Sequence, residues 1–150
     1  MYEASERLKQ SLSSEPRFEV INSNDSDGFV TLFVVKQTAD SPSFFELDKL
    51  GKEIIREFGV YIHKFYLYMF EQQKRGNCWF ALDYSSGYHV LSNGIKIGVL
   101  KAYSMTPTFT PEKAIEMVSE LKRLLDEFDS VADTFEIKEV PHKPRPFVFR

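Results

Sequence analysis

The apolar residues between positions 43 and 75 recur with the three- and four-residue spacing of a helix. Ser43 and Glu46 form the capping box that starts many helices. The apolar stripe that follows consists of Phe44, Leu47, Leu50, Ile54 and Phe58. Gly59 either ends this helix or bends it, because the run at 60–75 fits a helix or a β-rich stretch, and its Glu, Gln and Lys residues favour a helix.

A second amphipathic helix is predicted near the end of the chain. Thr110 is a typical capping residue and Pro111 suits the first helical position. The apolar stripe of this helix consists of Ile115, Val118, Leu121, Leu125 and Phe128. Residues 2–13 are also rich in helix formers, but their apolar positions are few, namely Tyr2, Ala4, Leu8 and Leu12. We therefore expect the stump of a linker helix whose packing partner lies upstream.

Runs of β-branched and aromatic residues predict short strands. These runs occupy residues 17–21, 29–36, 78–84, 87–92 and 95–104. Asn93 and Gly94 stand between two apolar runs, which is typical of a two-residue hairpin turn, so residues 88–92 are expected to pair with 95–104 in antiparallel fashion. The whole pattern predicts an α+β fold, with an antiparallel sheet of three to four strands and two or three helices packed on one face.

The length of 150 residues fits one compact domain. We expect a linker helix stump at residues 1–15 and a small α+β domain at 16–128. Residues 129–150 are expected to form an extended, proline-rich, basic tail, in which "TFEIKEV" resembles a short edge strand.

Charge and cysteine content narrow the classes of function. There are 19 Lys and Arg against 22 Asp and Glu, a net charge of -3, which provides no general field for nucleic acid. The longest apolar stretch, "FGVYIHKFYLYMF", contains His63 and Lys64 and is too short to span a bilayer. The one cysteine, Cys78, cannot form an internal disulfide. We expect a cytoplasmic protein that binds neither nucleic acid nor membrane.

One lysine stands where an apolar side chain is expected. If side chains alternate along residues 95–105, Lys101 shares a face with five neighbours, namely Ile95, Ile97, Val99, Tyr103 and Met105. A charge on a core-facing stripe is costly unless it is paired or reaches water. Lys101 therefore either extends its ammonium to solvent along its four-carbon stem or marks the place where the stripe ends at a cleft.

Other chemically reactive residues form no clear motif. Cys78 and His89 are conceivable as nucleophile and base, but a single cysteine beside a tryptophan is typical of a small buried hydrophobe. His63, His89 and His142 have no metal-ligand spacing, so no metal site is expected.

The order of the predicted elements and the segment "GVLKAYSMTPTFTPEKAI" carry a resemblance to a known family. Over roughly residues 2–128 the chain resembles the C-terminal small domain of the group II pyridoxal-phosphate-dependent amino-acid decarboxylases, such as the glutamate, aromatic amino acid and diaminobutyrate enzymes. The matching positions are Leu100, Lys101, Thr106, Pro107, Thr110 and Ile115. Two letters depart from the family pattern, since Lys101 replaces an arginine and Thr106 an asparagine.

The resemblance implies a place in a larger enzyme. In the family, the small domain closes the cleft against a large domain that carries the pyridoxal phosphate, and the arginine helps to hold the substrate carboxylate. Lys101 and Tyr103 are thus the candidate substrate-binding residues, and no residue of this chain is expected to be catalytic or to bind the cofactor alone. Lysine offers a point charge rather than a planar two-pronged donor, so carboxylate binding should be looser. The implied partners are the large domain, an amino-acid substrate and a second subunit of a homodimer.

A different class of function fits the same order of elements. A stand-alone split βαβ, ferredoxin-like module that binds a ligand or a partner without catalysis also has strands, a helix, a hairpin and a helix. Such a module is expected to be monodisperse, whereas an enzyme's isolated small domain is expected to expose an apolar surface.

Overall fold

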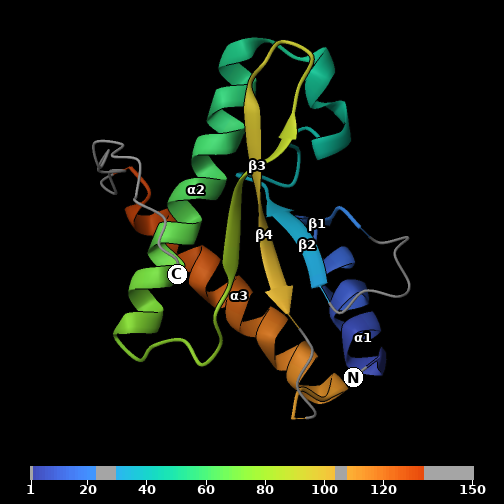
Figure 1. Cartoon of the computed structure of the whole chain (residues 1–150). Helices are drawn as coiled ribbons and strands as arrows, with labels where there is room; N and C mark the ends of the chain where they lie inside the picture. The colour runs from blue at the N-terminus through green and yellow to red at the C-terminus, as the bar shows by residue number, and fades with distance from the viewer. Residues whose placement is uncertain (1, 23–29, 104–107, 134–150) are drawn as a thin grey trace, which may run out of the picture.

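The computed structural model describes residues 2–22, 30–103 and 108–133 (Figure 1). The elements in these ranges are α1 (Tyr2–Ser13), β1 (Phe18–Val20), β2 (Val30–Val35), the 3-10 helix η1 (Phe44–Lys49), α2 (Lys52–Lys74), β3 (Asp83–Val90), β4 (Lys96–Tyr103) and α3 (Pro111–Val131). Met105, Thr106 and Pro107, and the predicted tail from residue 134 onward, lie outside the described residues. Within the described ranges no helix has both the length and the apolar composition of a membrane span.

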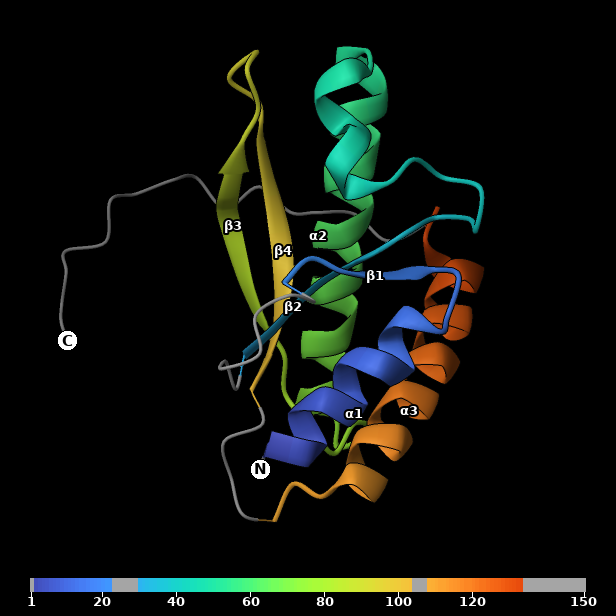
Figure 2. The same cartoon turned by 90° about the vertical axis from the view of Figure 1, so that its right-hand side faces the viewer.

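The described strands form one antiparallel sheet with the order β1-β2-β4-β3. β2 and β4 lie in the middle, where Phe33 and Leu100 stand opposite each other and are both fully buried. Figure 2 shows α2 and α3 on one side of β3 and β4. The predicted α+β fold is confirmed.

The helices meet the sheet through a continuous apolar core. On α2 and α3 the rings of Phe65 and Phe128 lie 5.6 Å apart in an edge-to-face arrangement, a favourable geometry for aromatic pairs. The buried residues of the two helices recur every three or four positions. Each helix therefore presents one stripe to the core and a charged face to solvent.

The first helix is part of this core. α1 packs against α3 and β1, and Ala4, Leu8 and Leu12 are fully buried. The structure thus differs from the expectation of a linker stump whose partner lies upstream. Ser5 is buried beside them, and α1 also contacts β2, so this short face is enclosed by α3 and the sheet edge.

The predicted helix after Ser43 is divided in two. Its capping box is present, but it heads η1, which ends at Leu50 in extended backbone. α2 then starts after Gly51 and continues through Gly59 to Lys74, so the helix predicted at 60–75 is confirmed. The interruption changes the helical phase. Ile54, predicted on the buried stripe, is 46% exposed, and Ile55 is buried instead.

The last helix starts and packs nearly as predicted. Thr110 caps it by accepting a hydrogen bond from the backbone N–H of Lys113. Four of the five predicted stripe residues are buried, but Ile115 is 45% exposed because the first turn buries Ala114 and Met117 instead. α3 also continues to Val131, beyond the predicted start of the extended tail at residue 129.

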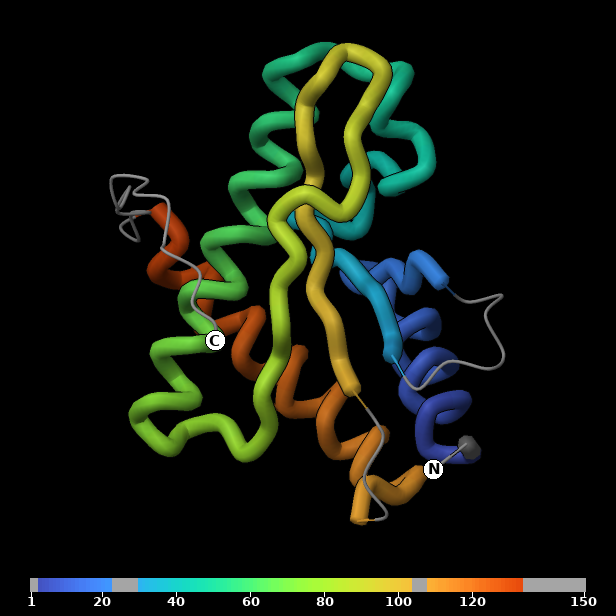
Figure 3. The backbone as a smooth tube through the Cα atoms, in the orientation of Figure 1, coloured from blue at the N-terminus to red at the C-terminus, as the bar shows by residue number. Residues whose placement is uncertain are grey.

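The two strands predicted at 78–84 and 87–92 are one irregular strand. β3 begins at Asp83, and residues 78–82 lie outside any strand. Between the pairs Ser85–Val99 and His89–Ile97, β3 has three residues where β4 has only Gly98, which is a bulge. Figure 3 shows β3 crossing in front of β4 at mid-length. The bulge therefore joins two half-strands that the sequence pattern separates.

A polar network fastens the sheet edge to both long helices. Arg17, just before β1, donates from Nε to the carbonyl of Lys36 at 3.0 Å and from Nη1 to the Asp129 carboxylate at 2.6 Å. Its Nη2 donates to the Tyr61 hydroxyl at 2.5 Å, and that hydroxyl donates to Asp129 at 2.5 Å. One guanidinium thus holds β2, α2 and α3 in fixed relation.

Replacing Tyr61 by Phe tests this network. Tyr61→Phe removes a hydroxyl that bonds to two charged groups, so we expect the free energy of unfolding to fall by about 1 to 2 kcal/mol. Urea denaturation at pH 7 measures it. Tyr88→Phe is the matched control, because the Tyr88 side chain is 43% exposed on β3. An equal loss in both variants would contradict the role of the network.

The stability difference between wild type and Tyr61→Phe should also depend on pH. Burial and the Asp129 carboxylate raise the pKa of Tyr61 above its ordinary value. The folded state therefore favours the neutral hydroxyl of Tyr61. The stabilisation that this hydroxyl gives is lost as the pH rises above about 10, the pKa of tyrosine in the unfolded chain. The difference in unfolding free energy between wild type and Tyr61→Phe should therefore shrink above that pH.

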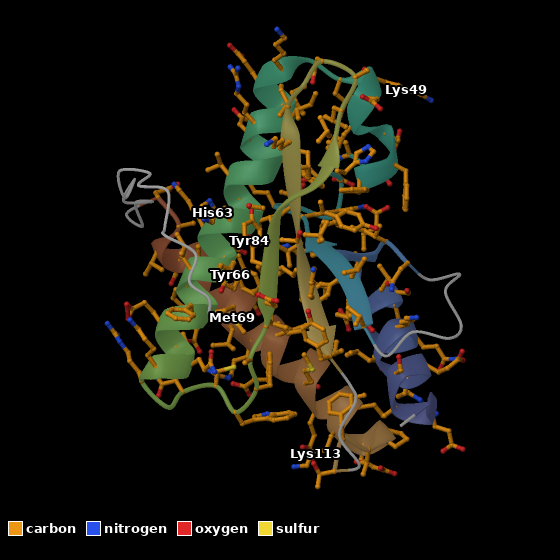
Figure 4. The ribbon with its side chains drawn as sticks, in the orientation of Figure 1. Lys49, His63, Tyr66, Met69, Tyr84 and Lys113 are labelled. Atoms are coloured by element: carbon orange, nitrogen blue, oxygen red, sulfur yellow. The ribbon has the colours of Figure 1, made fainter. Side chains whose placement is uncertain are left out.

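A close approach between β4 and an aromatic ring requires a glycine. The ring of Tyr84 stacks on His63 and Tyr66 of α2, with 5.1 Å between ring centroids in both pairs, and Figure 4 shows the three side by side. A methyl group on Gly98 would lie 2.5 Å from Cζ of Tyr84. Only a hydrogen fits there, so Gly98 fixes how deeply the ring is seated.

We expect Gly98→Ala to lower the free energy of unfolding by about 1 to 3 kcal/mol, because the added methyl overpacks the site. In a Tyr84→Ala background the same change should cost much less, since the obstructing ring is gone. Urea denaturation of the four proteins of this cycle measures both effects. An undiminished cost in the double variant would mean that Gly98 acts through its own backbone.

Candidate functional site

Lys101 stands in the middle of the sheet on the face turned away from α2. It lies directly opposite Leu32 of β2 and Asp83 of β3. Its chain neighbour Leu100 pairs with Tyr84, whose ring packs on α2. Because opposite residues of antiparallel strands share a face and successive residues alternate, Lys101 points the other way. We call the face formed by Leu32, Asp83, Lys101 and Tyr103 the Lys101 face.

Along this face of β4, the buried part of the apolar stripe ends at Lys101. Val99 is buried, Lys101 is half-buried and Tyr103 is 51% exposed. The same gradient occurs on β2, where Val34 is fully buried and Leu32 only half-buried. The ammonium therefore stands at the boundary between the core and solvent.

The cover at the buried end of this face is η1. Glu19, which pairs with Val34, accepts hydrogen bonds from the Ser43 hydroxyl and from the backbone N–H of Phe44 at 2.7 Å. The ring of Phe44 then lies 5.7 Å from that of His89 on β3. The capping residues of η1 thus attach it across one end of the sheet and leave the other end, with Lys101, outside it.

The charges around Lys101 are only partly matched. Oδ1 of Asp83 accepts a hydrogen bond from the backbone N–H of Tyr84 at 2.9 Å, and Oδ2 accepts one from the Tyr103 hydroxyl at 3.4 Å. No ion pair to Lys101 occurs among the described residues. The carboxylate across the strand is thus bound by neutral donors, and the ammonium keeps its capacity to bind an anion.

The structure brings both predicted site residues together. Lys101 and Tyr103 are two positions apart on β4 and share a face, as the alternation predicts. Sequence reasoning missed Asp83, which joins them through its bond to Tyr103. The hairpin register is what could identify Asp83 from the sequence. The bulge in β3 shifts that register, so counting back from the turn does not place Asp83 opposite Lys101.

Cys78 and His89 have separate surroundings. The Cys78 thiol donates to the carbonyl of Phe80 at 3.1 Å, and burial raises its pKa, which favours the unreactive protonated form. His89 lies against Phe44. The interpretation of Cys78 as a small buried hydrophobe is confirmed. Across the described ranges, no three His, Cys, Asp or Glu side chains gather as metal ligands.

Comparisons of the chain with protein-family models, with curated proteins and with solved structures found no significant match.

If Lys101 serves binding rather than folding, its charge contributes little to stability. We expect Lys101→Met to leave the free energy of unfolding unchanged or to raise it by about 0.5 kcal/mol, because a side chain of similar length then rests beside Leu32 without a charge. Lys49→Met in η1 is the control for an exposed lysine. In urea denaturation, a loss of more than about 1 kcal/mol in Lys101→Met alone would make Lys101 a structural residue.

Proposed function

We propose that this chain is a small domain without catalytic groups of its own, which closes a binding cleft by placing the Lys101 face against a larger body. One observation carries the proposal: an ammonium without an ion pair in the described structure stands at the edge of an apolar stripe, beside an exposed tyrosine. A half-buried ammonium that has no ion pair among the described residues can bind an anionic group brought by a partner or substrate.

The resemblance suggests what the larger body is. In the decarboxylase form of the proposal, it is the large pyridoxal-phosphate domain of an amino-acid decarboxylase, and the whole enzyme is a cytoplasmic homodimer. The cofactor supplies the electron sink for decarboxylation. Lys101 binds the carboxylate of the amino-acid substrate, and Tyr103 covers it from the same face. Among the described residues, Lys101 is half-buried and Tyr103 is 51% exposed, so the proposal places the cofactor on the partner body.

Two features of the fold support this form. The element order and the antiparallel sheet are those that the resemblance implies for the small domain. The position matched to the family's arginine is also the position where the apolar stripe meets solvent. A lysine there binds a carboxylate as a point charge, so substrate orientation would depend on the partner body.

The native gene product, purified intact with any coding sequence that flanks this chain, tests the proposal. It should bind pyridoxal phosphate and release carbon dioxide from an L-amino acid. Lys101→Ala should raise KM about tenfold or more, because it removes a charged contact to the carboxylate. Lys101→Arg should restore binding, whereas Lys49→Ala should change nothing. A product that neither takes up the cofactor nor releases carbon dioxide would rule out the decarboxylase form.

A second candidate, the stand-alone module, is favoured by one observation. α1 buries its apolar face on α3, so the described core is filled from within the chain. This candidate requires that the purified protein be monodisperse and that Lys101→Ala affect the binding of a protein or small anion rather than any turnover. Sedimentation of the intact protein, together with the cofactor test above, separates the two.

A further inference from the structure

A groove lies between α2 and the β3–β4 hairpin, and none of the four residues of the Lys101 face lines it. It has a volume of about 330 Å³, within the range of small-molecule sites. Apolar side chains of both elements form its walls, among them Ile55, Val60 and Ile97. The groove is thus separate from the Lys101 face and is formed by one helix and one hairpin.

Two cations border this groove. Arg56 on α2 and Lys96 on β4 both line it, and neither forms an ion pair within the described part of the chain. The stem of Lys96 passes over Gly87 of β3, where an added methyl would touch its Cδ at 3.6 Å. The lining residues include no carboxylate. The groove therefore carries a local charge of about +2 on a protein whose net charge is -3.

One wall of the groove is a rigid aromatic pair. The rings of His63 and Tyr84 are stacked with an angle of 9° between their planes, and both line the groove. Figure 4 shows them between α2 and β3. Burial lowers the pKa of His63, so at neutral pH the ring is uncharged and carries one hydrogen-bond donor and one acceptor. Ser86 adds a hydroxyl to the same lining.

The floor contains a glycine that the helix does not need. Gly59 lies in the interior of α2, where glycine is less stable than alanine. A methyl group at Gly59 would meet only Cδ1 of Ile97, at an ordinary 3.5 Å. Alanine would therefore fit at this position. Glycine instead leaves the groove deeper by one methyl group and makes the helix less stable.

We propose that this groove binds a small phosphate monoester with an apolar or aromatic body. A phosphate monoester carries a charge of about -1.5 to -2 at pH 7, which matches Arg56 and Lys96 together, whereas a carboxylate matches only one of them. The guanidinium of Arg56 suits two phosphate oxygens, and Lys96 supplies a point charge. The body of the ligand rests on the His63–Tyr84 pair and the apolar wall.

Phenyl phosphate is the probe for this site, with binding followed by NMR titration of the intact protein. It should bind more tightly than inorganic phosphate, which lacks the ring, and than benzoate, which lacks the second charge. Arg56→Gln and Lys96→Gln should each weaken it about tenfold. Lys113→Gln, at the start of α3 and well away from the hairpin in Figure 4, should leave the affinity unchanged.

Gly59→Ala separates binding from folding. It should raise the melting temperature by a few degrees, because alanine favours the helix, and yet weaken phenyl phosphate binding by narrowing the groove. Thermal unfolding and the same titration measure the two effects. The proposal is overturned if phenyl phosphate does not bind, if Arg56→Gln and Lys96→Gln bind like wild type, or if benzoate binds equally well.

Discussion

The arrangement of the layers depends on the guanidinium of Arg17. It lies where β1 begins, and it bonds at once to a backbone carbonyl after β2, to Tyr61 on α2 and to Asp129 on α3. Apolar packing alone allows helices to slide over a sheet, since it is not directional. A planar guanidinium whose Nε, Nη1 and Nη2 atoms each donate to a different segment is directional and opposes such sliding. The network therefore sets where α2 crosses the sheet, and hence which side chains of α2 meet the hairpin.

β4 separates two chemically different surfaces. On one side Leu100 and Ala102 are buried, and the aromatic stack and the groove of Arg56 and Lys96 lie towards α2. On the other, the stripe of Val99, Lys101 and Tyr103 leads from the core to solvent. Both surfaces hold cations without an ion pair in the described ranges, although the protein as a whole is acidic. The packing that buries β4 ends at a different place on each of its two faces. This is why one central strand can contribute to two separate binding surfaces.

Elements set by local chemistry were predictable, and register was not. The Ser43 capping box, the Thr110–Pro111 helix start and the antiparallel hairpin are all present. The hairpin loop, however, has three residues rather than two: the backbone N–H of Leu91 donates to the carbonyl of Ile95, which leaves residues 92–94 in the loop, and Gly94 adopts a φ of +87°. The bulge in β3 then brings Asp83 opposite Lys101. The same stretch brings the ring of Tyr84 over Gly98, a close approach between strands that no local sequence pattern predicts. That Lys101 and Tyr103 share a face follows from the alternation of strand side chains, whereas Asp83 and the groove required the fold.

The contact between α1 and α3 has a consequence for synthesis on the ribosome. α1 is made well before α3, so its buried residues Leu8 and Leu12 reach their contacts on α3 only after α3 has emerged. Translation adds about 5 to 20 residues per second, so these leucines stay exposed for several seconds in every nascent chain. The described fold is completed by its first and last helices, and a chaperone that recognises a short amphipathic segment would meet α1 before the other helices of this fold.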